Sequence, residues 1–179
     1  MLDYGTGYSL VEVSAPYGYV LNSEPVYFDI TEDASTEEGA VTIVKVERPN
    51  MPQKGTITVS KSGEVFSSVT EADGLYQPVY ASAGLAGAVY EITAAEDIIT
   101  PDGTLRYSKG EVAATIETDG TGTATTEPLY LGSYEIREIK APYGMVLNPE
   151  TKSVQLTYAG QEIEITETAA SFYNERQCI

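Results

Sequence analysis

Three polar residues lie where β-strands would turn them towards a protein interior: Lys61, Glu138 and Asn174. Side chains on a strand alternate between two faces, and each of the three continues a row of apolar residues. The rows are Ile57-Val59-Lys61, Tyr134-Ile136-Glu138 and Phe172-Asn174. Burial disfavours charge, so a buried lysine tends towards its neutral form and a buried glutamate towards its protonated form. A neutral Lys61 amine is a nucleophile, and a protonated Glu138 would donate a hydrogen bond to the Asn174 carboxamide oxygen and polarise its carbon.

The elements that carry these residues are expected to be short β-strands. Tyr, Val, Ile and Thr alternate with polar residues over short runs, and turn signals separate the runs. The runs include residues 56–59, 88–92, 153–157 and 162–165, and the turns include residues 72–74, 101–103, 119–120 and 159–160. No long stretch has the 3.6-residue apolar period of a helix. The pattern therefore predicts an all-β chain folded as a sandwich.

The composition excludes several functional classes. The chain has 179 residues, 42% of them apolar, and a formal net charge of −17, which disfavours contacts with nucleic-acid phosphates and with anionic lipid. It has no histidine and one cysteine, Cys178, so a disulfide within the chain and a Cys/His zinc site are excluded. We expect no metal and no cofactor. The carboxylates of Glu96, Asp97 and Asp102 lack EF-hand spacing, and a solvated loop explains them better than calcium.

Targeting signals are not evident in the sequence. No apolar stretch is long enough to span a membrane, so no membrane insertion is expected within this fragment. Met1 is not followed by a basic region and an apolar core, and no sortase-type LPxTG ending is present. If the chain is part of a surface protein, both signals lie outside this fragment.

One motif occurs twice, 126 residues apart. Residues 8–22 (YSLVEVSAPYGYVLN) recur as residues 134–148 (YEIREIKAPYGMVLN). A repeat of this length has the size of a small domain. We therefore expect residues 1–50 to be the C-terminal part of a truncated module, residues 51–54 to be a linker, and residues 55–177 to be one complete module.

The repeated pattern, Tyr-x-apolar-x-Glu-x-x-Ala-Pro-x-Gly, resembles the E-box of Cna-B-type (collagen-adhesin B, prealbumin-like) domains of Gram-positive adhesins and pilins. Residues 54–61, 85–90 and 172–175 match other parts of that family's pattern, so the resemblance covers nearly the whole chain. It implies an Ig-like or prealbumin-like β-sandwich that serves as a stalk module. It also implies an extracellular location on a cell wall, with neighbouring modules of the same surface protein as partners.

The resemblance further implies an isopeptide bond between Lys61 and Asn174, formed with Glu138 as proton shuttle. Such a reaction happens once in each chain, so the protein is not expected to be an enzyme. The two residues are 113 positions apart, and closing a loop of that size would stabilise the fold by about 4–5 kcal/mol, by analogy with a disulfide. A pull on the two ends of the module would pass through this bond.

A second, incomplete site is expected in the first copy of the repeat. Glu12 and Asn50 match the acid and the asparagine, although Pro49 differs from Tyr173 at the preceding position. The lysine strand of that copy is not in this chain. We expect an unfilled groove there, with residues 1–50 either loose or paired through an open strand edge with a neighbouring module or another chain.

Each member of the trio also has a plainer interpretation. Lys61 would be solvated at a strand end, Glu138 would pair with Arg137 or Lys140 on the surface, and Asn174 would lie in a turn.

The competing function is a carbohydrate- or host-protein-binding module. Its ligand site would be the sheet face rich in the 14 tyrosines, or residues 63–84, which include Phe66, Tyr76 and Tyr80. The plainer interpretation of residues 63–84 is an extra hairpin that covers the edge of the sandwich. A glycoside hydrolase fragment is disfavoured, because the chain has no tryptophan and no evident catalytic carboxylate pair.

Overall fold

The computed structural model describes residues 2–32 and 42–177, and every helix-or-strand element among them is a β-strand. The N-terminal segment, defined here as the described part of residues 2–53, has four short strands. They are β1 (Gly5–Leu10), β2 (Tyr19–Val20), β3 (Val26–Ile30) and β4 (Met51–Pro52). β1 pairs with β3, and β2 pairs with β4, both antiparallel.

The remaining strands form the sandwich, defined here as residues 54–174. They are β5 (Lys54–Ala72), β6 (Leu75–Gly84), β7 (Val89–Ala94), β8 (Ile98–Ile99), β9 (Leu105–Tyr107), β10 (Val112–Glu117), β11 (Thr123–Thr125), β12 (Leu129–Tyr130), β13 (Gly132–Lys140), β14 (Thr151–Leu156) and β15 (Ile165–Asn174). One sheet has the strand order β10–β7–β13–β14, and the other is built around β5, which pairs with β6, β11, β12 and β15. The predicted all-β sandwich is confirmed.

The two sheets enclose one apolar core. β5 buries every second residue from Gly55 to Lys61, as expected for a strand with one face inward. The core side chains come from both sheets and include Ile57, Val59, Tyr90, Ile92, Tyr134, Ile136 and Phe172. Burial of these large side chains is the main favourable contribution to folding.

The parallel pairing of β5 and β15 brings the two ends of the sandwich sequence together. In this register Lys61 lies opposite Phe172, and Asn174 lies opposite Gly63. The first and last strands of the sandwich are therefore direct neighbours, although their paired residues are 111 positions apart in the chain.

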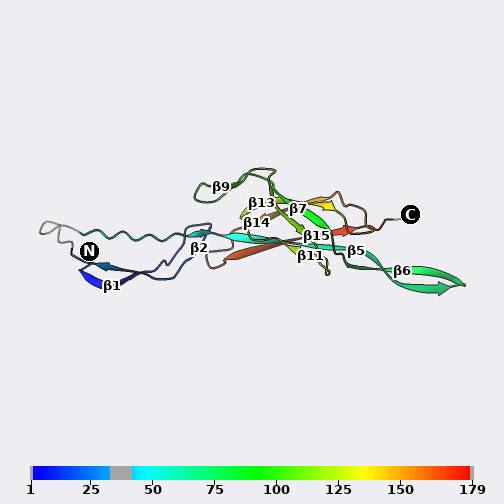
Figure 1. The fold of residues 1–179 in the computed structure, drawn as a ribbon, viewed down its shortest axis with the longest axis horizontal. Helices are drawn as coiled ribbons and strands as arrows, with labels where there is room; N and C mark the ends of the chain where they lie inside the picture. The colour runs from blue at the N-terminus through cyan, green and yellow to red at the C-terminus, as the bar shows by residue number, and fades with distance from the viewer. Residues whose placement is uncertain (1, 33–41, 178–179) are drawn as a thin grey trace.

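Residues 63–84 form a hairpin, but they do not cover the edge of the sandwich as the plainer interpretation expected. Beyond the two packed sheets, β5 and β6 continue as a two-stranded ribbon, defined here as residues 63–84 (Figure 1). A two-residue turn joins them, with left-handed backbone at Asp73 (φ 54°) and Gly74 (φ 77°), which suits the right-handed twist of a hairpin. Most ribbon side chains are exposed because no second layer covers them.

The expectation of a strand over residues 162–165 is wrong, since β15 begins only at Ile165. Residues 159–163 form a loop around the Gln53 side chain. Its Oε1 accepts from Ala159 N at 2.9 Å, and its Nε2 donates to Gly160 O at 2.8 Å and to Ile163 O. A side chain thus satisfies backbone groups that a strand would use for pairing.

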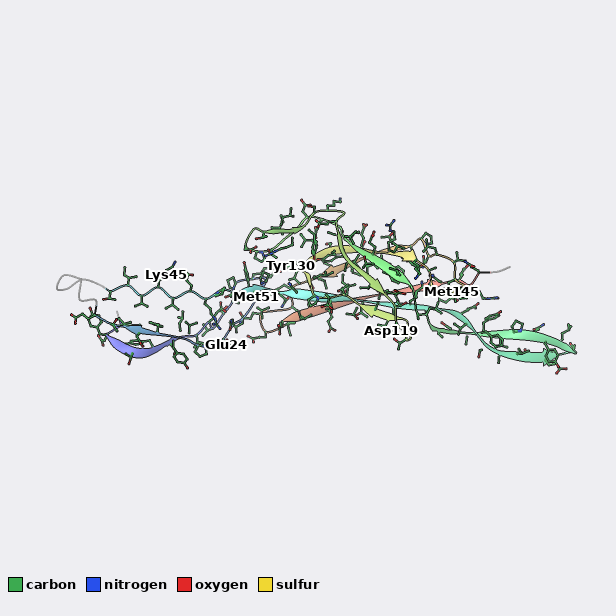
Figure 2. The ribbon with its side chains drawn as sticks, in the orientation of Figure 1. Glu24, Lys45, Met51, Asp119, Tyr130 and Met145 are labelled. Atoms are coloured by element: carbon green, nitrogen blue, oxygen red, sulfur yellow. The ribbon has the colours of Figure 1, made fainter. Side chains whose placement is uncertain are left out.

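The N-terminal segment, the sandwich and the ribbon follow one another along the long axis of the molecule (Figures 1 and 2). Within residues 2–32 and 42–177 there is no helix of the length and apolar character needed to cross a membrane.

Candidate functional site

Lys61, Glu138 and Asn174 come from three strands and meet inside the sandwich. Lys61 lies on β5, Glu138 on β13 and Asn174 at the end of β15, and they are 2%, 2% and 1% exposed. In each strand the residue follows alternating buried positions, so period-two geometry turns it inward.

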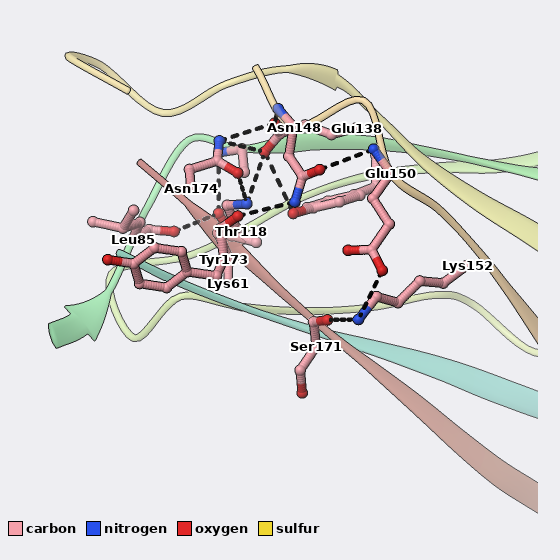
Figure 3. A network of polar contacts seen from close by, with 12 residues as sticks. Lys61, Leu85, Thr118, Glu138, Asn148, Glu150, Lys152, Ser171, Tyr173 and Asn174 are labelled. Atoms are coloured by element: carbon pink, nitrogen blue, oxygen red, sulfur yellow. Dashed lines mark hydrogen bonds and ion pairs between the residues drawn. The ribbon is translucent and has the colours of Figure 1, made fainter. Parts of the chain in front are cut away.

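The three side chains contact one another directly (Figure 3). The Lys61 Nζ donates to Asn174 Oδ1 and lies 3.2 Å from Glu138 Oε1. The Asn174 Nδ2 donates to both carboxylate oxygens of Glu138, at 3.0 and 2.9 Å. One carboxylate therefore touches both the amine and the amide nitrogen.

The turn after β13 helps to fix the carboxylate. In the Ala-Pro-Tyr-Gly sequence, Met145 N donates to Pro142 O at 3.1 Å, and Gly144 adopts a left-handed backbone (φ 76°). The reversed chain brings Asn148 N to 2.7 Å from Glu138 Oε2. On the other side, the Tyr90 hydroxyl donates to Glu138 Oε1 at 3.4 Å.

Two aromatic rings pack beside the buried cluster. The rings of Tyr90 and Phe172 lie 4.9 Å apart, and Lys61 Nζ is 5.9 and 6.0 Å from their centroids. Burial lowers the pKa of Lys61, against the opposing effect of the Glu138 carboxylate. Burial and the nearby Glu138 also raise the pKa of Tyr90, so its hydroxyl stays a hydrogen-bond donor.

Comparisons with known proteins identify the family of this fold. A sequence profile described as SpaA, a prealbumin-like fold domain, matches residues 1–46 and 79–169, which is more than half of the chain. The chain belongs to this prealbumin-like family. A comparison with curated proteins gave no significant match.

Several solved structures resemble the chain at low sequence identity. The Bacillus anthracis TIE protein is 23% identical, with a TM-score of 0.52 over 98% of this chain and 26% of that one. The major pilin SpaD of Corynebacterium diphtheriae is 25% identical (TM-score 0.43, 69% of this chain, 30% of that one). The minor pilin of Streptococcus agalactiae is 17% identical (TM-score 0.44, 71% and 46%). This chain thus spans between about a quarter and a half of their lengths.

The prealbumin-like match includes Glu12 and Glu138 but not Lys61, Asn50 or Asn174. The family match therefore carries no information on Lys61, Asn50 and Asn174, and the evidence for their roles is their geometry in this chain.

The plainer interpretations of the trio do not fit this prealbumin-like domain. Lys61 does not reach solvent, and Glu138 is not a surface charge. The two basic residues beside Glu138 have other partners: Arg137 lies 3.0 Å from Glu91, and Lys140 lies 4.0 Å from Glu117.

The structure differs from the expected hydrogen bond in which Glu138 donates to the Asn174 oxygen. That oxygen faces Lys61, and the amide nitrogen faces Glu138. The reason is that Lys61 Nζ brings only donors, so the amide turns its acceptor towards the amine and its donor towards the carboxylate.

Sequence reasoning missed Tyr90 and the backbone of Asn148 as parts of the site. For Asn148 a signal was present, because the repeated motif ends in Leu-Asn in both copies, at Asn22 and Asn148. For Tyr90, its position facing Glu138 depends on the pairing of β7 with β13, which residue spacing alone does not give.

The first copy of the motif holds a similar but smaller cluster. Asn50 Nδ2 donates to Glu12 Oε1 at 2.6 Å, and Asn22 N donates to Glu12 Oε2 at 3.0 Å. These bonds correspond to those of Asn174 and Asn148 with Glu138. The hydrogen bond from Asn50 and that from Asn22 lower the pKa of Glu12. Within the described residues no lysine contacts this pair.

A groove lies beside the first copy of the motif. Apolar and Thr side chains line it: Leu2, Leu10, Phe28, Ile30, Thr42, Val44 and Val46. In the sandwich, the corresponding face of β13 is covered by Ile57 and Val59 of β5. The groove thus resembles the inner face of a sheet from which the strand equivalent to β5 is missing among the described residues.

No group of three or more Cys, Asp or Glu residues within the described ranges is placed to hold a metal ion. The acidic loop residues instead bond to nearby groups. Asp97 accepts from Lys109 N at 2.8 Å, and Asp102 accepts from Thr100 Oγ1 at 2.6 Å.

The lowered pKa of Lys61 predicts a pH dependence in an Asn174→Ala variant, which cannot form the amide. Below the ordinary lysine value of 10.5, the unfolded chain holds a proton that folded Lys61 gives up at a lower pH. Because the unfolded state binds more protons, the free energy of unfolding should rise with pH from the lowered pKa up to about 10.5.

Denaturant titrations across this pH range measure the effect. The double variant Lys61→Met/Asn174→Ala is the reference, because it keeps Tyr90 and Tyr134, whose pKa values are raised by burial. Equal pH slopes in the two variants would contradict the prediction.

Proposed function

We propose that this chain is part of the stalk of a Gram-positive surface protein, an adhesin or pilin, attached to the cell wall. In this proposal residues 55–177 are a complete module, stabilised by a self-formed amide between Lys61 and Asn174. The observation that supports it best is the contact of amine, carboxamide and carboxylate in a buried position. Membership of the prealbumin-like family supports the stalk role.

The proposed reaction balances as an amide exchange. The neutral Lys61 amine attacks the carboxamide carbon of Asn174, one N–H proton passes to Glu138, and Glu138 delivers it to the Asn174 nitrogen. That nitrogen leaves as ammonia, and the carboxylate is regenerated. Glu138 contacts both nitrogens already, at 3.2 and 2.9 Å. Fixed geometry of this kind supplies roughly 7–11 kcal/mol in well-oriented intramolecular reactions.

The family resemblance and the cluster of Glu12, Asn22 and Asn50 suggest a role for residues 1–50 in the stalk. We propose that Glu12 and Asn50 belong to a preceding module whose lysine strand fills the groove along Leu10, Phe28 and Val44. The segment would then be one end of a stalk module, cross-linked when its own first strand is present.

Intact mass spectrometry of the chain tests the proposal. The parent chain should be lighter than its sequence mass by one ammonia, and Lys61→Ala or Glu138→Ala should restore the full mass. The matched control is Lys152→Ala, since Lys152 lies 5.1 Å from the Phe172 ring but outside the cluster. A full sequence mass in the parent chain would refute the cross-link.

A second candidate function has one observation in its favour. Large apolar side chains are exposed on the ribbon: Phe66, Val69, Leu75 and Tyr76. Such a surface fits a carbohydrate or host-protein ligand. Glycan arrays and pull-downs with the chain and a Phe66→Ala/Tyr76→Ala variant test this, and saturable binding that the variant loses would favour it.

A further inference from the structure

The end of the N-terminal segment that faces the sandwich is covered by it through specific contacts. Ala15 N donates to Gln161 Oε1 at 2.8 Å, and Leu21 N donates to Gln161 O at 2.9 Å. The Tyr17 ring lies 4.6 Å from that of Tyr158. Gln53 is 1% exposed because the loop of residues 159–163 surrounds its side chain.

The backbone close to these contacts recurs at the other end of the sandwich. Gln53 N donates to Gly18 O at 2.8 Å, and Gln177 N donates to Gly144 O at 2.8 Å. The β2–β4 pair that flanks the first bond has its counterpart in the bridge between Met145 and Arg176. Residues 15–21 and 53 therefore correspond to residues 141–147 and 177.

In the second copy none of the described residues covers this face. Gln177 is exposed and donates from its side chain only to Met145 O, at 3.1 Å, among the described contacts. Tyr143 is fully exposed, and Val146 and Leu147 are 49% and 48% exposed, whereas Val20 and Leu21 are half-buried.

Two further comparisons distinguish the covered end from the bare end. A Cβ on Gly18 would lie 2.7 Å from Pro101 Cγ, whereas one on Gly144 would meet nothing within 4 Å. The hollow along Val20 and Leu21 is lined on its other side by Lys54, Pro128 and Ile165 of the sandwich. Among the described residues, the hollow along Val146 and Leu147 has no such second wall.

We propose that residues 141–147 and Gln177 form a docking face for a second sandwich of the same kind as residues 54–174. The occupant presents the loop equivalent to residues 158–163. That loop surrounds and hydrogen-bonds the side chain of Gln177, as the loop in this chain does with Gln53. Its glutamine equivalent to Gln161 accepts from Ala141 N and Leu147 N. This inference rests on the stalk role proposed above and names the surface through which successive modules hold a fixed orientation.

Adjacent modules joined in this way would form a stiff rod. Flexible tethers leave the relative orientation of two domains free, but four hydrogen-bonding groups of Gln53 and Gln161 fix the one junction present in this chain. A repeated junction would transmit that orientation along the stalk.

A fused chain tests the docking face. Residues 1–177 are followed directly by a second copy of residues 54–177, so that Asn174-Glu175-Arg176-Gln177 precedes Lys54-Gly55 as Asn50-Met51-Pro52-Gln53 does in the parent. The added copy contains every residue of the apolar core, from Ile57 to Phe172. Amide hydrogen exchange at Ala141 and Leu147 is the measurement.

Exchange at these two amides should be at least about tenfold slower in the fusion than in the parent chain, because each gains a hydrogen bond. Gln177→Ala in the fusion should return both to the parent rate, and Tyr143→Ala should weaken protection. The control Tyr76→Ala removes an exposed tyrosine of the ribbon and should change nothing. Gln53→Ala in the parent chain should likewise expose the amides of Ala15 and Leu21.

Equal exchange rates at Ala141 and Leu147 in the fused and parent chains would overturn the docking face. Such a result is separable from a failure of the cross-link, because the intact mass reports the loss of ammonia whether or not the modules dock.

Discussion

Lys61→Met is expected to lower the free energy of unfolding by about 4–5 kcal/mol, the contribution of closing a loop of this size in the unfolded chain. Methionine keeps a flexible apolar stem in the core, so the change mainly removes the cross-link. Urea titration of the parent and the variant measures the difference. Lys152→Met is the control, because Lys152 lies on β14 and bonds to Ser171 O on the outside of the cluster.

A second variant separates the covalent bond from the ion pair. Asn174→Ala also prevents the cross-link but leaves Lys61 and Glu138 in contact, 3.2 Å apart. Both variants should lose the loop contribution. If Asn174→Ala unfolds at the same urea concentration as the parent, the covalent bond contributes nothing to stability and the first prediction is wrong.

Gly122→Ala is expected to destabilise the fold by about 2–6 kcal/mol, because left-handed backbone and overpacking each cost about 1–3 kcal/mol. Gly122 has φ +81°, and a Cβ there would lie 2.4 Å from Lys61 O and 2.6 Å from Leu85 N. It also accepts from Lys61 N at 2.7 Å, so a shift of this loop disturbs the strand that carries the lysine.

The same loop supplies the control for this substitution. A Cβ on Gly120 would meet nothing within 4 Å, and its backbone is not left-handed. Gly120→Ala should therefore be nearly neutral in the same urea titration. Similar losses from the two substitutions would show that the close contact at Gly122 is not the cause.

The fold class and the burial of the trio follow from strand periodicity. Lys61 continues the row of Ile57 and Val59, and the structure buries it on the same face. A one-residue error in register would have moved it to solvent, so a strand with one buried face specifies the position strongly.

Details that depend on neighbouring strands did not follow from the sequence. Residues 162–165 alternate between apolar and polar as a strand does. The buried Gln53 side chain instead forms hydrogen bonds with the backbone of the loop of residues 159–163. The orientation of the Asn174 amide is set by Lys61 and Glu138 together, which no single segment encodes. The direction of the ribbon depends on how far β6 follows β5 beyond the sheet.

The ribbon also has a consequence for what the molecule can carry. Its turn at Asp73 and Gly74 lies between Lys61 and Asn174 in the chain. Both turn residues are exposed, and the ribbon of β5 and β6 extends to one end of the molecule (Figure 1). Under the proposed bond, tension would run from β5 to β15 without entering residues 62–173. A peptide inserted at this turn would be displayed at the end of the ribbon, outside the path of the tension and without lengthening the stalk.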